Sequence, residues 1–285
     1  MSQKAADQKQ RPKSDTIKHA LVSHKWLYLM LIPGVLYMLI FNYLPMGGLV
    51  MAFQEFSPYN GDSMIGAFLQ SPFVGLSVFK KFFTGPDFLQ LLKNTLSISI
   101  TSLIFYFPAP IILALLLNEI KNAAFKRVTQ TMVYIPHFIS MVIVAALTAQ
   151  LFSTTDGLVY HWLVEIFGRN NAPDVMSNPR LFVPMIVGQN MWKETGYGTI
   201  IFLAALSGVD VQLYEAAEVD GANRWQKMWH ITLPAIKSTI VIMLILKVGS
   251  ILNTGYEQIF LMQNSMNRTV SDVFDTYIYT KGVVN

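Results

Sequence analysis

The sequence predicts an all-α integral membrane protein, and two features support this: low charge content and long apolar runs. Only 13% of the 285 residues are charged and 53% are hydrophobic, whereas soluble domains usually carry about 25% charged residues. Uncharged runs long enough to cross a bilayer recur along the chain. The lack of cysteine excludes a disulfide framework and thiolate metal sites.

Five segments are predicted to cross the membrane. A helix needs about 20 apolar residues to cross a hydrocarbon core of about 30 Å, and five stretches qualify: about 26–54, 94–118, 128–155, 181–207 and 236–253. The first could instead be a signal peptide, whose apolar core is about 7–15 residues long. Because the first stretch is much longer, we expect it to be retained. Prolines inside the spans predict kinks, and neighbouring side chains must satisfy the backbone groups that kinks release.

The N-terminal tail, residues 1–25, predicts the orientation of the chain. It holds six Lys or Arg residues against only Asp7 and Asp15. Basic segments beside a span stay on the cytoplasmic side, so we expect the N-terminus and the loops at 119–130 and 208–235 to lie in the cytoplasm. A basic tail can also bind nucleic acid. Beside a span we interpret it as an orienting segment, and we predict no nucleic-acid partner.

The loop at 208–235 carries more structure than a connection between two spans requires. Treated as a helix, it gathers its apolar residues on one face, from Tyr214 to Met228, and Glu215 and Glu218 on another. Gly221 predicts a sharp turn between two short helices, because glycine costs about 1 kcal/mol inside a helix. Asp220 and Arg224 have the spacing of an i,i+4 ion pair. An amphipathic helix on lipid usually has a basic polar face. This segment is net acidic over 215–227, so we expect it to enter a groove on a protein.

The same loop carries a long sequence motif. The spacing E-A-A, three residues, G, nine residues, I-x-L-P is met by Glu215, Ala216, Ala217, Gly221, Ile231, Leu233 and Pro234. It resembles the EAA motif of the membrane subunits of binding-protein-dependent ABC importers. "WKETGYGTIIFLAALSGV" before it and "NTGYEQIFLMQN" after it resemble the carbohydrate-uptake permeases, in particular the branch that imports oligosaccharides or polysaccharide fragments.

This resemblance implies a fold, a location and a set of partners. It implies the helical bundle of a type I importer permease in a bacterial cytoplasmic membrane. Permeases of this type have a sixth span after the "GYEQIF" region, and no apolar run remains there. Either the sequence is truncated, which we expect, or the chain lacks this span by design. The implied partners are a second, related permease chain, a dimer of cytoplasmic ABC ATPases, an extracytoplasmic solute-binding protein and a carbohydrate. ATP and Mg²⁺ are expected on the ATPases, with no cofactor on this chain.

The resemblance also implies roles in coupling to the ATPase. Glu215 is expected to contact the ATPase, Ala216 and Ala217 to permit close packing, and Gly221 to set the turn. The full set of expected coupling residues adds Asp220, Ile231, Leu233 and Pro234 to these four.

Polar residues inside the spans are candidates for the substrate pathway, because they are costly in lipid. Amides and carboxylates bind sugar hydroxyls, and aromatic rings stack on sugar C–H faces. The candidates are Gln189, Asn190, Trp192, Lys193, Glu194, Tyr197, Asn253, Tyr256 and Glu257. Lys193 and Glu194 could instead form a structural pair that faces the partner permease. Lys247 could pair with a carboxylate across that interface, extend to the membrane surface, or contact substrate.

No enzyme signature is present in the sequence. It contains neither G-x-x-x-x-G-K-[ST] nor H-E-x-x-H, and its five histidines lack metal-ligand spacing. We therefore predict no catalytic and no metal site, although His137 beside Pro136 could be functional or could serve polar packing. Two alternatives remain: a permease of the same superfamily for another solute, and an intramembrane enzyme, which would need clustered carboxylates or a nucleophile–base pair.

Overall fold

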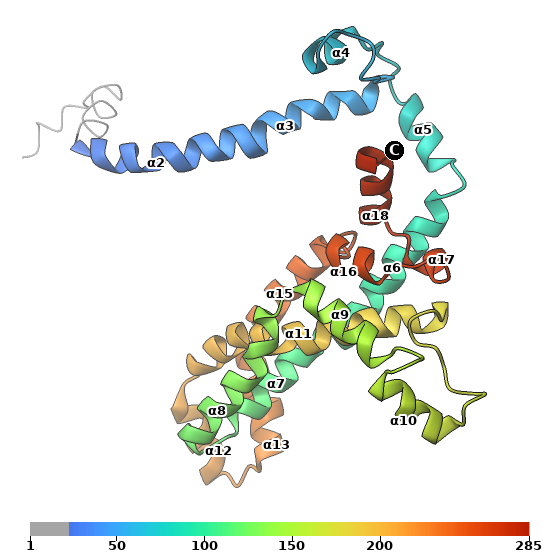
Figure 1. The fold of residues 1–285 in the computed structure, drawn as a ribbon. Helices are drawn as coiled ribbons and strands as arrows, with labels where there is room; N and C mark the ends of the chain where they lie inside the picture. The colour runs from blue at the N-terminus through green and yellow to red at the C-terminus, as the bar shows by residue number, and fades with distance from the viewer. Residues whose placement is uncertain (1–22, 285) are drawn as a thin grey trace, which may run out of the picture. The chain divides into compact units, whose positions relative to one another are not determined.

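The computed structural model describes residues 23–284, so most of the predicted tail lies outside the described residues. The chain forms two compact units that divide after Gly85 (Figure 1). As predicted, the described residues are helical, apart from loops and one isolated bridge between Gln54 and Phe73.

The first unit begins with a long apolar helix. α2 (Lys25–Met38), the π-helix η1 (Leu39–Tyr43), α3 (Leu44–Met46) and the 3-10 helix η2 (Gly47–Phe53) follow one another without interruption. Together they form a candidate span of 29 residues. The short helices α4 (Met64–Gln70) and α5 (Ser77–Phe83) complete this unit.

The second unit contains the remaining helices. α6 (Phe88–Phe105) and α7 (Pro108–Asn118) form one candidate span, which begins six residues before the predicted one. The next helices are α8 (Ala123–Tyr134), the 3-10 helix η3 (Ile135–Phe138), α9 (Met141–Leu151), α10 (Leu158–Phe167), α11 (Pro179–Ser207) and α12 (Val211–Val219). The last are α13 (Arg224–Lys227), the π-helix η4 (Met228–Thr232), α14 (Leu233–Ala235), α15 (Lys237–Gly249), α16 (Tyr256–Met262), α17 (Arg268–Ser271), α18 (Phe274–Tyr279) and the π-helix η5 (Thr280–Val284).

Three of the predicted spans correspond to bent helix pairs. Within the described residues two helices are long and apolar enough to cross a membrane, and counting each bent pair as one span raises the number to five. The segment predicted as one span at 128–155 is divided by a bend of 94° between η3 and α9. Ile139 and Ser140 adopt extended backbone conformations there, and the Ser140 hydroxyl caps α9. The segment predicted to reach residue 253 is helical only to Gly249, because Ser250 to Asn253 form a turn.

Helix α11 runs through the centre of the second unit (Figure 1). One core cluster joins it to α6, α9 and α16 through buried residues such as Ile98, Ala145, Ile186 and Ile259. A second cluster, made of Ala114, Phe202, Leu206 and Ile236, fixes the C-terminal end of α11 against α7 and the start of α15. α11 is therefore held along most of its length.

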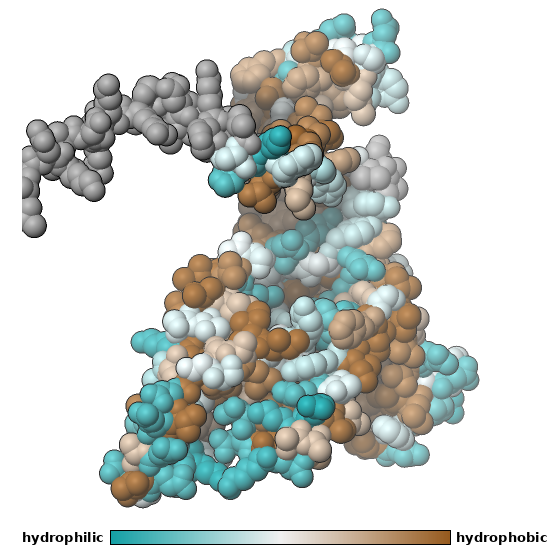
Figure 2. Space-filling model, turned by 90° about the vertical axis from the view of Figure 1, so that its left-hand side faces the viewer, coloured by the Kyte–Doolittle hydropathy of each residue, from teal (hydrophilic) through white to brown (hydrophobic). Residues whose placement is uncertain are grey.

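Hydrophilic residues gather at one end of the second unit. Figure 2 shows them at its lower end, where Figure 1 places α8, α12 and α13. This arrangement puts the loops predicted to be cytoplasmic, at 119–130 and 208–235, at the same end of the unit.

Gly196 marks a close approach between α11 and α8. A Cβ atom at this position would lie 1.8 Å from the carbonyl oxygen of Val133. The backbone of α8 therefore passes directly over Gly196, and only glycine fits this helix crossing.

We predict that Gly196→Ala lowers the thermal stability of the protein in detergent. Backbone atoms cannot yield as a flexible side chain can, so the helices must separate, at a cost of about 1–3 kcal/mol. Gly188→Ala on the same helix is the matched control, because nothing lies within 4 Å of its Cβ position. Equal melting temperatures for the two variants would contradict the close crossing.

Candidate functional site

The break between η3 and α9 opens the backbone beside α11. Pro136 lies in the first turn of η3, and the chain leaves helical geometry at Ile139. Backbone groups released at such a break need partners when the segment lies in a membrane. The Nζ of Lys193 donates a hydrogen bond to the carbonyl oxygen of His137, at 2.8 Å. A side chain of α11 thus provides a hydrogen-bond donor for a backbone carbonyl at the break.

Lys193, Glu194 and His137 form a charge cluster at this break. Lys193 Nζ lies 2.7 Å from Glu194 Oε1, and His137 Nδ1 lies 2.7 Å from Glu194 Oε2. The His137 ring also stacks on Tyr197, with ring centroids 3.9 Å apart. Lys193 is only 9% exposed, so it needs a nearby anion. Glu194 supplies that charge.

An open cavity of about 560 Å³ lies against this cluster. Three segments line it: η3 with the start of α9, the middle of α11, and the chain from Thr254 into α16. Of the predicted pathway residues, it brings together Asn190, Lys193, Glu194 and Glu257. Amide, ammonium and carboxylate groups converging on one cavity can bind a polyhydroxylated solute.

Two predicted pathway residues on α11 lie elsewhere. Gln189 is 8% exposed and belongs to a hydrogen-bonded network in the core, where it donates to Thr148 Oγ1 at 2.7 Å and accepts from Gln258 Nε2 at 2.8 Å. It supports Gln258, which lines the cavity. Trp192 lines a separate, largely apolar cavity of about 580 Å³ together with Leu147 and other apolar side chains.

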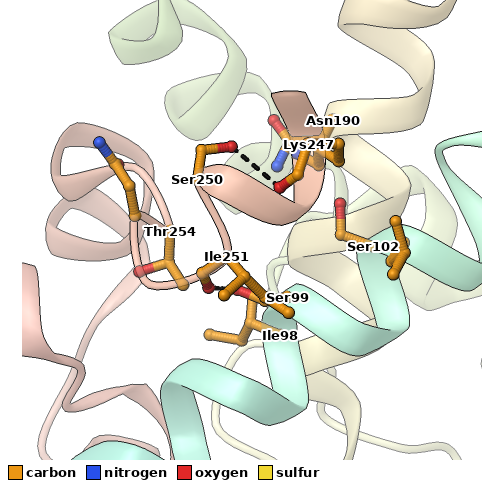
Figure 3. Close-up of a pocket in the computed structure, with 10 residues that line it drawn as sticks. Ile98, Ser99, Ser102, Asn190, Lys247, Ser250, Ile251 and Thr254 are labelled. Carbon is orange, nitrogen blue, oxygen red and sulfur yellow. Dashed lines mark hydrogen bonds between the residues drawn. The ribbon is translucent and has the colours of Figure 1, made fainter. Parts of the chain in front are cut away.

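Two further predicted residues follow α15. Tyr256 packs into an aromatic cluster, with ring centroids 5.2 Å from Phe260 and 4.8 Å from Tyr279. Asn253 lines a small polar cavity of about 40 Å³ between α6, α11 and the end of α15 (Figure 3). The predicted set is thus divided between two polar cavities, one apolar cavity and the core.

Lys247 lines the same small cavity. Its Nζ lies 5.4 Å from the centroid of the Tyr106 ring, a cation–π contact worth about 0.5–2 kcal/mol. Among the described residues it forms no ion pair with a carboxylate. Charged side chains inside membrane segments are costly, so one cation–π contact is a weak compensation for this charge.

Sequence reasoning missed several cavity residues, among them Ser140, Thr254 and Gln258. The signals that could have identified them are helix breaks: Pro136 before Ser140, and Gly255, with φ +87°, beside Thr254. Within the described residues no group of three His, Asp or Glu side chains could hold a metal ion.

The segment that resembles the EAA motif forms a helical hairpin, which we call the coupling hairpin (residues 208–235). Asp210 caps the N-terminus of α12, and its carboxylate accepts a hydrogen bond from the backbone N–H of Gln212 at 2.9 Å. Glu215, Ala216 and Ala217 lie on α12, and Asp220 ends it. Gly221 has φ +76°, a conformation that glycine adopts without strain. Asn223 then opens α13 with a capping box to Gln226.

Side chains join the two arms of the coupling hairpin. The Tyr214 and Thr232 hydroxyls lie 2.9 Å apart, and Lys227 Nζ lies 3.3 Å from Glu218 Oε2. Ile231 lies in η4, and Leu233 and Pro234 begin α14, which leads to α15. The prediction of an Asp220–Arg224 ion pair is wrong: among the described residues these two side chains form no ion pair. The turn at Gly221 separates the end of α12, at Asp220, from the start of α13, at Arg224.

Comparison with known proteins identifies relatives of this chain. The family model of the binding-protein-dependent transport system inner membrane component matches residues 106–283. Protein LplB of Bacillus subtilis is 53% identical over 93% of this chain and 80% of its own length. The polygalacturonan/rhamnogalacturonan transport system permease protein YteP of the same organism is 49% identical over 92% of this chain and 79% of its own length.

A solved structure shares the fold. A chain of a bacterial ABC transporter involved in the import of the acidic polysaccharide alginate superposes with a TM-score of 0.84 at 38% identity. The match covers 94% of this chain and 88% of that chain.

We predict that Glu194→Gln destabilises the protein by about 1–3 kcal/mol, because it leaves the buried Lys193 without its counter-charge. The double variant Lys193→Met/Glu194→Gln should recover part of the loss, since it leaves no uncompensated ammonium. Thermal unfolding in detergent measures both effects. Glu257→Gln, at an exposed carboxylate of the same cavity, is the control. A Glu194→Gln variant as stable as this control would refute the account of the cluster.

Proposed function

The chain belongs to the family of binding-protein-dependent transport system inner membrane components, and we propose that it forms the membrane path of an ATP-driven importer for an oligosaccharide. In this proposal its N-terminus is cytoplasmic, and it assembles with a second, related permease chain. A pair of cytoplasmic ATPases binds ATP and Mg²⁺, and an extracytoplasmic binding protein delivers the solute. The chain itself is a transport subunit and not an enzyme.

The observation that carries the proposal is the direct connection between the coupling hairpin and the cavity. α12 follows α11 after a bend of 71°, and α11 supplies Asn190, Lys193 and Glu194 to the open cavity. A displacement of the hairpin is therefore transmitted along one helix to the residues that line the cavity. The buried cluster around Phe202 and Leu206 holds the C-terminal end of α11 in place.

The surface of the hairpin suits a protein partner. Glu215, Glu218 and Asp220 are exposed on it, and so are the apolar side chains of Leu213, Val219, Trp225 and Trp229. A large exposed apolar surface edged by charge is typical of a docking site. We propose that it enters a groove on an ATPase, with Glu215 at the contact, Ala216 and Ala217 allowing close approach, and Gly221 holding the turn.

The mechanism follows from rigid-body motion. When the two ATPases close on ATP, the docked hairpins of the two permease chains move together. The spans then change the side of the membrane to which the cavity opens, as in other transporters with a site between moving helical bodies. The breaks at Ile139 and at Ser250 to Gly255 place hydrogen-bonding groups along this path.

The assignment to oligosaccharides rests on the cavity and on the relatives. Amide, hydroxyl and carboxylate groups line the cavity at Ser140, Asn190, Thr254 and Gln258 as well as Glu257. The similar proteins named for polygalacturonan/rhamnogalacturonan transport and for alginate import handle carbohydrates.

Purification of the tagged chain from native membranes in mild detergent tests the proposal. We expect an ABC ATPase and a second permease chain to copurify, and the reconstituted assembly to import an oligosaccharide only with ATP and the binding protein. Recovery of the chain without an ATPase, under conditions that keep a known importer intact, would contradict the proposal.

We predict that Gly221→Val reduces ATP-driven uptake by at least tenfold while the chain still reaches the membrane. A left-handed conformation costs a residue with a Cβ roughly 1–2 kcal/mol, and a β-branched residue more, so the turn rearranges and the hairpin no longer fits its groove. Gly221→Asn is the matched control, because asparagine tolerates positive φ. Nothing lies within 4 Å of the Cβ position, so a steric clash does not explain a difference between the variants. Equal uptake by both would argue against the turn as the coupling element.

A further inference from the structure

We infer that the imported oligosaccharide carries carboxylate groups and that Lys247 is the side chain that binds them. The inference rests on the proposed function and makes its substrate class more specific. It begins from the small polar cavity at the end of α15.

Lys247 supplies the charge of this cavity. Ten described residues line it, from α6, α11, α15 and the turn that follows α15 (Figure 3). The other polar members are neutral: Ser99, Ser102, Asn190, Ser250, Asn253 and Thr254. The cavity thus combines one ammonium group with hydroxyls and amides, which is the chemistry that recognises a sugar bearing a carboxylate.

The nearby carboxylates have other partners. Glu194 is bound by Lys193 and His137. Asp275 accepts hydrogen bonds from the backbone N–H of Thr254 at 2.9 Å and from its hydroxyl at 3.2 Å. Within the described part of the chain, Lys247 contacts the Tyr106 ring and forms no ion pair. A charged side chain inside a membrane segment commonly pairs with an opposite charge, and no carboxylate among the described residues pairs with Lys247.

The small cavity adjoins the larger one. Asn190 and Thr254 line both. A solute held by Asn190 and Glu257 in the larger cavity can therefore extend a second sugar unit toward Lys247. At about 40 Å³ the small cavity admits the carboxylate of that unit and not its ring.

The names of two similar proteins also refer to acidic carbohydrates. The solved transporter is involved in import of an acidic polysaccharide, and polygalacturonan, in the name of YteP, is a polymer of a sugar acid. These facts concern those proteins.

The first test asks whether position 247 faces the solute path. The chain has no cysteine, so Lys247→Cys carries a single thiol. In the complete importer we expect it to react with a negatively charged methanethiosulfonate, and we expect trigalacturonate to slow the reaction. Ile245→Cys, whose side chain is exposed on the same helix, should be unaffected by trigalacturonate. A Lys247→Cys thiol that stays unreactive would place Lys247 against lipid or against the second permease chain and would overturn the inference.

The second test compares uptake of trigalacturonate with uptake of its methyl ester, which lacks the charges. We expect Lys247→Met to reduce uptake of the acid about tenfold, because it removes one hydrogen bond to a charged group. It should change uptake of the ester less than twofold. Lys247→Arg should retain the preference for the acid, and Lys237→Met, at an exposed lysine that begins the same helix, should change neither. The binding protein is the same in every assay, so a change in the ratio reports on the permease.

The outcomes separate the two proposals. If the importer takes up neutral oligosaccharides and Lys247→Met leaves the ratio of acid to ester unchanged, the inference is wrong and the importer function stands. If the complete assembly with ATP imports no oligosaccharide, acidic or neutral, the proposed function fails, and the inference fails with it.

Discussion

The structure depends on one constraint: backbone groups released by a broken helix must find hydrogen-bond partners when the helix lies in a membrane. Side chains of neighbouring helices satisfy this constraint at two breaks of the second unit, one after η3 and one after α15. Lys193 of α11 donates to the carbonyl oxygen of His137, and Ser99 of α6 donates to that of Ile251. The breaks are therefore stable features, and each exposes polar groups to a cavity. Because Lys193 is buried, this solution in turn requires Glu194 as its counter-charge.

Helix α11 links the two functions of the chain. Its middle carries the cluster of Lys193 and Glu194, and Gly196 brings the backbone of α8 close to it. Its C-terminal end is fixed by the buried Phe202 and Leu206 and leads directly into the coupling hairpin. The parts of the chain that we propose to contact the solute and the ATPase are thus mechanically continuous, which is what an importer requires of its membrane subunit.

Much of this account could be predicted from the sequence, because composition and the E-A-A spacing are local signals. The helical class, the turn at Gly221 and the membership of the importer family are confirmed. The spatial details could not be predicted. Nothing local distinguishes Gln189, which is in the core, from Asn190, which lines both polar cavities. The Asp220–Arg224 pair failed because helical spacing was applied across a turn. The His137 carbonyl that Lys193 binds and the Tyr106 ring that Lys247 contacts both belong to residues distant in the sequence.

The central claim is that the coupling hairpin docks on an ATPase. Because the chain has no cysteine, Glu215→Cys can carry a single benzophenone–maleimide photo-crosslinker in the assembled importer. The account predicts a cross-linked product with the combined mass of this chain and the ATPase, and it predicts none from Tyr59→Cys, a highly exposed position of the first unit. An ATPase that copurifies but never cross-links to position 215 would contradict the account.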